Sequence, residues 1–110
     1  MLAEYLNKEK RLFFYCDLHA HAGKKGCFFY GNALDDYIMQ VESQCFAKIM
    51  SMNCINFEYD DCNFTKKHMA SKDRFEPISK EGCGRVNIYK INSIIHSYTL
   101  ECGFHCSNYI

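Results

Sequence analysis

The sequence has 110 residues, enough for one domain or for part of one. Hydrophobic residues make up 48% of it and charged residues 24%, which is typical of a globular protein and excludes a disordered tail. The formal net charge is +0, without the surplus of lysine and arginine that nucleic-acid-binding proteins carry. No apolar run in the sequence is long enough to span a membrane.

The first eleven residues are rich in charge, and we take residues 1–11 as a lead-in to a single unit over residues 12–110. This start has no apolar core of the kind found in secretory signals. Eight cysteines are many for the length, and in a secreted protein they would indicate a disulfide framework. Without such a signal we expect reduced thiols instead, with cysteine acting as a small hydrophobe where it lies in an apolar pattern.

A buried strand is predicted over residues 12–18, where an apolar run leads into Asp17, His19 and His21. Short apolar runs of this kind are typical of buried strands, and sites in open α/β sheets form just beyond the carboxyl ends of the strands. The glycine-containing stretch 22–26 predicts a loop. A short strand is expected to follow it.

A helix is predicted from about residue 35 to about residue 52, with Asp35 or Asp36 as its N-cap. Apolar residues recur in it at intervals of three and four, which predicts one face packed in the core. That face comprises Ile38, Val41, Cys45, Ile49 and Met52.

The second half of the chain is more mixed. We expect a surface segment over 53–72 with at most one short strand, and then a loop over 71–84. Residues 85–90 fit either a strand or a short helix, and residues 93–104 predict a second buried strand. The order of elements favours α/β layers, but one good helix cannot cover two buried strands. We therefore expect part of a larger domain.

The second buried strand carries a single carboxylate, Glu101, in its apolar half. A histidine on one strand and a carboxylate on another is the pairing that metal-assisted hydrolysis uses. A plainer interpretation is that His19 is a hydrogen-bonded structural residue and that Glu101 reaches solvent at a sheet edge. From the pattern alone, the plainer interpretation is favoured. His96 and His105 have no partner at ligand spacing, so we expect both to be structural or exposed.

Two blocks of the sequence resemble the cytosolic carboxypeptidases, zinc metallopeptidases that remove glutamates from protein tails, above all those of tubulin. The first block is FYCDLHAHAGKKGCFFYGN, which is similar to the family's Asp-Leu-His-Gly-His segment, basic turn and Phe-Met-Tyr-Gly segment. The second is SKEGCGRVNIYKINSIIHSYTLECGF, which is similar to its Ser-Lys-Glu-Gly-x-Gly-Arg-Val and Ser-Tyr-Thr-x-Glu segments. The resemblance runs from about residue 12 to about residue 104. It implies a mixed-sheet α/β/α zinc carboxypeptidase fold, present as a partial domain.

The resemblance also implies roles for four residues. His19 would be the third ligand of one zinc ion, and Glu101 would be the catalytic carboxylate. Arg85 would lie at the base of the specificity pocket, and Lys80 would add positive charge nearby. The implied substrates are polyglutamylated tubulin tails or other glutamate-rich C-termini, with no nucleic-acid or membrane partner. The implied location is the cytoplasm, with microtubules or the nucleus as further sites.

The chain departs from the family pattern in three ways. Ala20 replaces the family's glycine, no histidine is followed by a glutamate three residues later, and the Asn-Arg element that grips the terminal carboxylate is absent. The sequence thus matches the C-terminal portion of a catalytic domain without two of its zinc ligands. We expect such a chain alone to bind zinc weakly and to hydrolyse nothing. The alternative is a non-catalytic module that binds acidic tails through Arg85 and Lys80.

Overall fold

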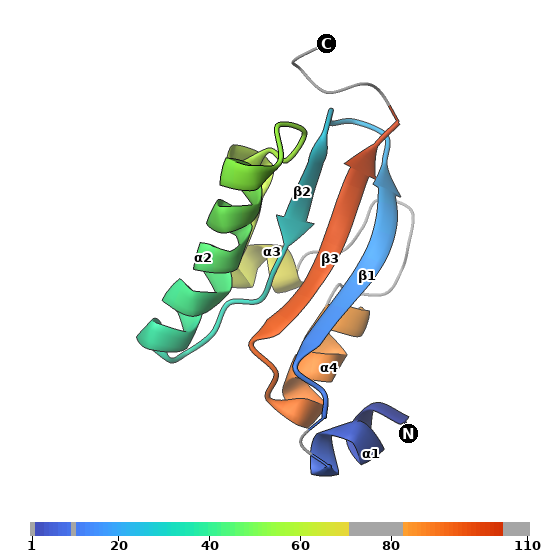
Figure 1. Ribbon diagram of the computed structural model, residues 1–110, viewed down its shortest axis with the longest axis vertical. Coiled ribbons are helices and arrows are strands. Elements are labelled where there is room, and N and C mark those ends of the chain that lie inside the picture. Colours follow the sequence, from blue (N-terminus) through green and yellow to red (C-terminus); the bar gives the residue numbers. More distant parts are fainter. Residues whose placement is uncertain (1, 10, 71–82, 105–110) are drawn as a thin grey trace.

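A computed structural model describes residues 2–9, 11–70 and 83–104 of the chain. Its elements are α1 (Leu2–Lys8), β1 (Phe14–His21), β2 (Cys27–Tyr30), α2 (Tyr37–Asn53), the short 3-10 helix η1 (Tyr59–Asp61), α3 (Lys66–Ala70), α4 (Gly84–Asn92) and β3 (His96–Gly103). The strands form a mixed sheet in the order β1-β3-β2, with β3 parallel to β1 and antiparallel to β2. Figure 1 shows β3 between its two neighbours, α2 beside β2, and α4 near the start of β1. The predicted α/β class is confirmed, as a small mixed sheet with helices.

The two faces of the sheet differ in chemistry because side chains alternate along each strand. One face, here called the polar face, carries Tyr15, Asp17 and His19 of β1 beside Ser97, Thr99 and Glu101 of β3. The opposite face, here called the apolar face, carries the side chains of Phe29, Tyr98 and Leu100, among others.

Helix α2 packs on the apolar face. It begins where predicted, with Asp36 as the N-cap accepting a hydrogen bond from the backbone of Met39 at 2.9 Å. The prediction of its buried face is wrong, because the predicted stripe is exposed, with Ile38 and Met52 about three-quarters accessible. The helix instead buries Ser43 and Ala47. These small residues let the helix approach the aromatic rings of the sheet closely. The prediction missed them because it followed the spacing of the larger apolar side chains.

The segment after α2 contributes to the core, whereas a surface segment was predicted. Phe57 and Phe64 are buried against Phe29 and Tyr98. The backbone runs along the free edge of β2, where the amide of Cys27 donates to the carbonyl of residue 56 at 2.8 Å. Two isolated β-bridges place this segment parallel to β2. The segment therefore covers the free edge of β2, for which the sequence pattern predicted no neighbour.

Strand β1 is less buried than predicted, and it begins and ends later than the range 12–18. Phe13 and Leu18 are 73% and 74% exposed, because β1 is an edge strand and none of the described elements packs over its outer part. The expectation that this chain cannot cover its own apolar strands is therefore confirmed for β1. It is wrong for β3, whose residues 96–99 are all buried as the pattern predicted.

Residues 84–92 form a helix, which settles the alternative left open by the sequence. α4 ends at Ser93, which adopts the left-handed conformation at φ 56°. The N-terminal helix α1 was not predicted and lies against α4. Among the described residues, no helix is both long enough and apolar enough to cross a membrane.

Candidate functional site

The two residues expected to carry the chemistry lie next to each other on the polar face. His19 of β1 and Glu101 of β3 are register partners in the parallel pair. The distance between His19 Nδ1 and Glu101 Oε1 is 4.0 Å, with the histidine half exposed and the glutamate side chain 9% exposed. Both lie within their strands rather than beyond the strand ends. The strands therefore fix the spacing of the imidazole and the carboxylate.

Asp17 orients the imidazole of His19. Its Oδ2 lies 3.0 Å from His19 Nε2. A carboxylate only accepts hydrogen bonds, so the proton in this bond sits on Nε2. In the neutral ring, Nδ1 is then the bare nitrogen, and it faces Glu101. A histidine that ligates a metal usually has its other nitrogen held by a carboxylate or carbonyl in this way.

Arg85 is buried on the same face, at 2% exposure. Its Nη1 donates to Thr99 Oγ1 and to Cys83 Sγ, each at 3.2 Å, and its Nε donates to the carbonyl of Gly31 at 3.4 Å. Its Nη2 is buried without a hydrogen-bond partner among the described residues. Burial lowers the pKa of Arg85, and negative charge on Cys83 and Glu101 opposes that effect.

The first turn of α4 is held tightly against the sheet, and this fixes Arg85. The carbonyl of Arg85 accepts hydrogen bonds from Ser97 Oγ at 2.7 Å and Asn32 Nδ2 at 3.1 Å. Gly84 precedes it and packs against the hydroxyl of Tyr15, leaving no room for a Cβ atom. The glycine of the Gly-Arg pair thus has a steric reason, since a Cβ atom there would require the Tyr15 side chain to move.

The other predicted residues have different positions. His21 is turned into its own loop, where Nδ1 accepts from the amides of Gly23 and Lys24 at 3.1 Å each. That nitrogen stabilises the turn after β1. Lys80 lies outside the described residues.

The described residues do not form a complete metal site. Within residues 2–9, 11–70 and 83–104, no group of three or more His, Cys, Asp or Glu side chains is arranged to hold a metal ion. Among the predicted site residues, His19 is the assigned zinc ligand, and its Nε2 is held by Asp17 with Nδ1 left as the donor atom. A zinc ion at this position therefore needs further ligands.

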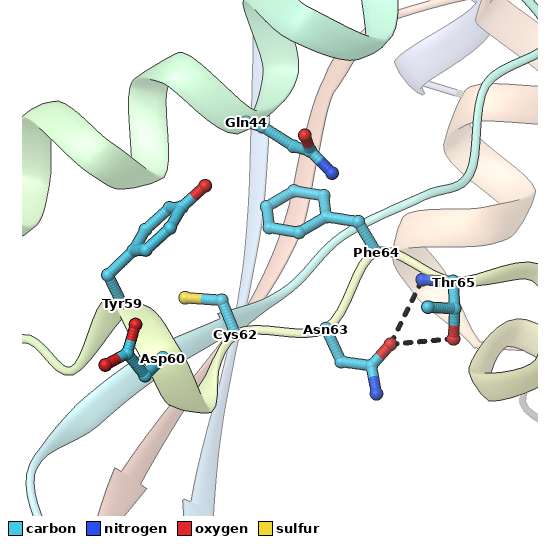
Figure 2. Close-up of a pocket in the computed structure, with 7 residues that line it drawn as sticks. All are labelled: Gln44, Tyr59, Asp60, Cys62, Asn63, Phe64 and Thr65. Carbon is cyan, nitrogen blue, oxygen red and sulfur yellow. Dashed lines mark hydrogen bonds between the residues drawn. The ribbon is translucent and has the colours of Figure 1, made fainter.

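A separate hollow of about 430 Å³ lies between α2 and the segment that contains η1. Figure 2 shows that Tyr59 and Gln44 line it from opposite sides, while Asn63 Oδ1 is already bonded to Thr65. None of the predicted site residues lines it. The hollow is thus distinct from the polar face.

Sequence reasoning missed the residues that hold Arg85 in place. Thr99 and Tyr30 contact its guanidinium, with the Tyr30 ring centroid 5.8 Å from Arg85 Cζ. One signal was available, since Thr99 precedes Glu101 by two positions and so shares its face. No comparable signal pointed to Asn32, which follows β2 and reaches α4 only through the fold.

Comparison with known proteins finds relatives that cover most of the chain. No family model matches the chain. It is 50% identical over 98 residues to cytosolic carboxypeptidase-like protein 5 of Rattus norvegicus and 47% identical over 98 residues to that of Danio rerio. It is also 32% identical over 100 residues to cytosolic carboxypeptidase 2 of Mus musculus. These alignments cover 89–90% of the chain but only 10–12% of the relatives. By its sequence, the chain belongs to the cytosolic carboxypeptidase family.

Proposed function

We propose that this chain carries part of the active site of a zinc carboxypeptidase that removes C-terminal or branch-point glutamates from polyglutamylated proteins such as tubulin. The observation that carries the proposal is the 4.0 Å separation of His19 Nδ1 and Glu101 Oε1 on a face that also buries Arg85. The carboxypeptidase names of the relatives support the reaction class.

His19 would provide one ligand of the zinc ion through Nδ1, and Asp17 would keep that nitrogen bare. A bound zinc ion supplies a Lewis acid that polarises a carbonyl and lowers the pKa of water. The remaining ligands would come from outside the described residues. This chain's own share of the metal centre is therefore the orientation of one imidazole.

Glu101 would act as the general base and then as the general acid. Its carboxylate is nearly buried yet 4.0 Å from His19, so a water molecule beside His19 is within reach of it. It would accept a proton from that water and pass it to the leaving amine. General acid–base catalysis of this kind accounts for about 10²–10⁴ in rate.

Arg85 would select glutamate. A buried cation with a free N–H is costly unless an anion compensates it. Nε and Nη1 already donate within the chain, so Nη2 would donate to the carboxylate of a substrate. The side chain of a substrate glutamate would supply that carboxylate, and Lys80, which lies outside the described residues, would add positive charge.

The test measures the release of glutamate from a peptide that ends in several glutamates. It compares the wild-type full-length protein, which would supply the remaining zinc ligands, with its Glu101→Gln variant. We expect the variant to release glutamate about 10²–10⁴ times more slowly while binding the peptide with similar affinity. Glu9→Gln, an exposed acidic residue at the end of α1, is the matched control. If Glu101→Gln retained the wild-type rate, the assignment of the catalytic carboxylate would be wrong.

The second candidate function is a binding module for acidic tails that does not cut them. It is favoured by Nη2 of Arg85, which has no hydrogen-bond partner among the described residues and could donate to a carboxylate whether or not a metal is present. Under this proposal the peptide binds equally well with and without a chelator, and no glutamate is released. Release that a chelator stops would rule it out.

A further inference from the structure

Two cysteines lie side by side on neighbouring strands, on the opposite face of the sheet from His19 and Glu101. Cys27 of β2 and Cys102 of β3 are register partners in the antiparallel pair. Their sulfur atoms are 3.3 Å apart, and both side chains are partly buried. We propose that Cys27 and Cys102 form a reversible disulfide, a redox-modification site that joins β2 to β3 next to Glu101.

The backbone geometry suits this bond. The amide and carbonyl of Cys27 bond to residues 56 and 58, so they point away from β3. The amide of Gly103 donates to the carbonyl of Gly26 at 2.8 Å. Gly26 and Gly103, the pair next to the two cysteines, are therefore a hydrogen-bonded pair. Cys27 and Cys102 are therefore a non-hydrogen-bonded pair, in which Cα atoms lie about 4.5 Å apart. This separation is within the range that a disulfide spans.

The side chains need only a small movement. A disulfide brings its sulfurs to about 2.05 Å, so these two must approach by roughly 1.2 Å. Other described thiols have different partners: Cys62 Sγ lies 3.7 Å from the carbonyl of Glu58, and Cys16 Sγ lies 3.9 Å from that of Asp17. Cys54 is near enough to influence the ionisation of Cys27, and Cys102 that of Cys16, so a test must exclude Cys54 and Cys16 as alternative partners.

The oxidant we name is a small-molecule disulfide such as glutathione disulfide. One cysteine thiolate attacks it, forms a mixed disulfide and releases one reduced glutathione. The second cysteine thiolate then displaces the other glutathione, which leaves as a thiol. Overall, two protein thiols are oxidised to one disulfide, and one glutathione disulfide is reduced to two thiols. An excess of reduced glutathione reverses both steps.

Burial makes this exchange slow at neutral pH. It raises the pKa of Cys27 to about 11, and the hydrogen bond with Cys102 adds to the effect. Only the thiolate reacts in each step, so the rate should increase as the pH rises toward that value. Under reducing conditions the two free thiols are the stable form. The disulfide forms only when oxidised glutathione accumulates.

The bond would act on the proposed active site through Phe28. This residue pairs with Glu101 across β2 and β3, directly beside the two cysteines. β2 is only four residues long, so a covalent link at one end restricts the whole strand. The disulfide itself does not depend on the proposed function, and it can be tested without measuring hydrolysis.

The experiment equilibrates the folded full chain in buffers with increasing ratios of oxidised to reduced glutathione. Free thiols are blocked with N-ethylmaleimide, and linked peptides are identified by mass spectrometry. We expect a peptide that joins Cys27 to Cys102, its loss on adding dithiothreitol, and its absence in Cys102→Ser. Cys45→Ser removes an exposed thiol on α2 and should leave the linked peptide unchanged.

Two results would overturn the proposal. One is a linked peptide that joins Cys27 or Cys102 to a third cysteine of the chain. The other is blocking of Cys27 and Cys102 by N-ethylmaleimide at every glutathione ratio while Cys45 becomes glutathionylated. Both are read from the wild-type chain, so the test stands even if Cys102→Ser fails to fold.

Discussion

His19 and Glu101 come from opposite ends of the sequence and are direct register partners on two parallel strands. Neighbouring strands lie about 4.8 Å apart, so the register itself sets the distance between an imidazole and a carboxylate. A shift of one residue would send one of the two side chains to the apolar face. The site therefore depends on the pairing of β1 with β3.

The first prediction concerns Asp17 and zinc. Replacing Asp17 with Ala removes the acceptor at His19 Nε2, so the ring loses its fixed orientation. We expect zinc affinity of the full-length protein to fall about 10- to 100-fold, as measured by competition with a chromogenic chelator. Asp60→Ala, an exposed carboxylate on η1, is the control and should have no effect. Equal affinities for all three proteins would show that Asp17 does not position the ligand.

The second prediction concerns the selectivity that Arg85 provides. Arg85→Met keeps a side chain of similar length but removes the guanidinium, so the KM for glutamate-ended peptides should rise. Replacing a buried charge with an apolar residue is often neutral for stability, so the variant should still fold. Steady-state kinetics on peptides ending in glutamate or leucine provide the measurement. Lys90→Met, on the exposed side of α4, should leave the ratio of the two KM values unchanged, and an unchanged ratio in Arg85→Met would contradict the assignment.

The sequence predicted most of the elements because each has a local cause. The apolar runs of β2 and β3 and the Asp36 cap of α2 were each visible within a few residues. The strand pattern pointed to His19 and Glu101 as a pair, and only the resemblance to a family favoured functional roles for them over structural ones. What the sequence could not supply was contact, such as the hydrogen bond that His19 Nε2 donates to Asp17 Oδ2.

The failures share a physical reason, which is that burial depends on partners distant in sequence. Helix α2 turns Ser43 and Ala47 toward the sheet because Phe29 and Tyr98 already fill the space there. The apolar stripe on its other side has no counterpart among the described residues. Phe57 was likewise assigned to the surface, because only the edge of β2 gives it a place in the core.

The third prediction concerns the close approach of β1 and α4. Gly84→Ala places a methyl group where the Tyr15 hydroxyl lies, so the Tyr15 side chain or one of the two elements must shift. We expect a loss of about 1–3 kcal/mol in the free energy of unfolding, measured by urea denaturation, together with weaker binding of glutamate-ended peptides. Ala70→Gly, at the end of α3, is the control, because it changes the backbone entropy of the unfolded chain without adding a side chain. Wild-type stability in Gly84→Ala would show that the approach is not tight.

The fourth prediction concerns a buried hydroxyl. The Tyr98 hydroxyl donates to the carbonyl of Ser43 at 2.9 Å and lies 2.9 Å from His96 Nδ1. Tyr98→Phe leaves that buried nitrogen without its partner, so we expect a loss of about 1–3 kcal/mol on urea denaturation. Tyr37→Phe, at a residue that is 79% exposed, should change stability by less than about 0.5 kcal/mol. If both variants lost a similarly small amount of stability, the hydrogen bonds of the Tyr98 hydroxyl would not contribute to the stability of the core.

The fifth prediction concerns alkaline pH. Burial raises the pKa of Tyr98 from 10.0 to about 12, so the folded chain keeps this proton where the unfolded chain has lost it. The stabilisation is complete below pH 10 and is lost as pH rises toward 12, at about 1.4 kcal/mol per pH unit. The pKa values of Cys27 and Cys62 are likewise raised from 9.0 to about 11. These two thiols therefore also lower the stability of the folded chain as the pH rises above 9. Urea denaturation between pH 8 and pH 12 should therefore show falling stability, with a shallower fall in Tyr98→Phe. Parallel curves for wild type and variant would mean that the Tyr98 hydroxyl titrates normally in the folded state.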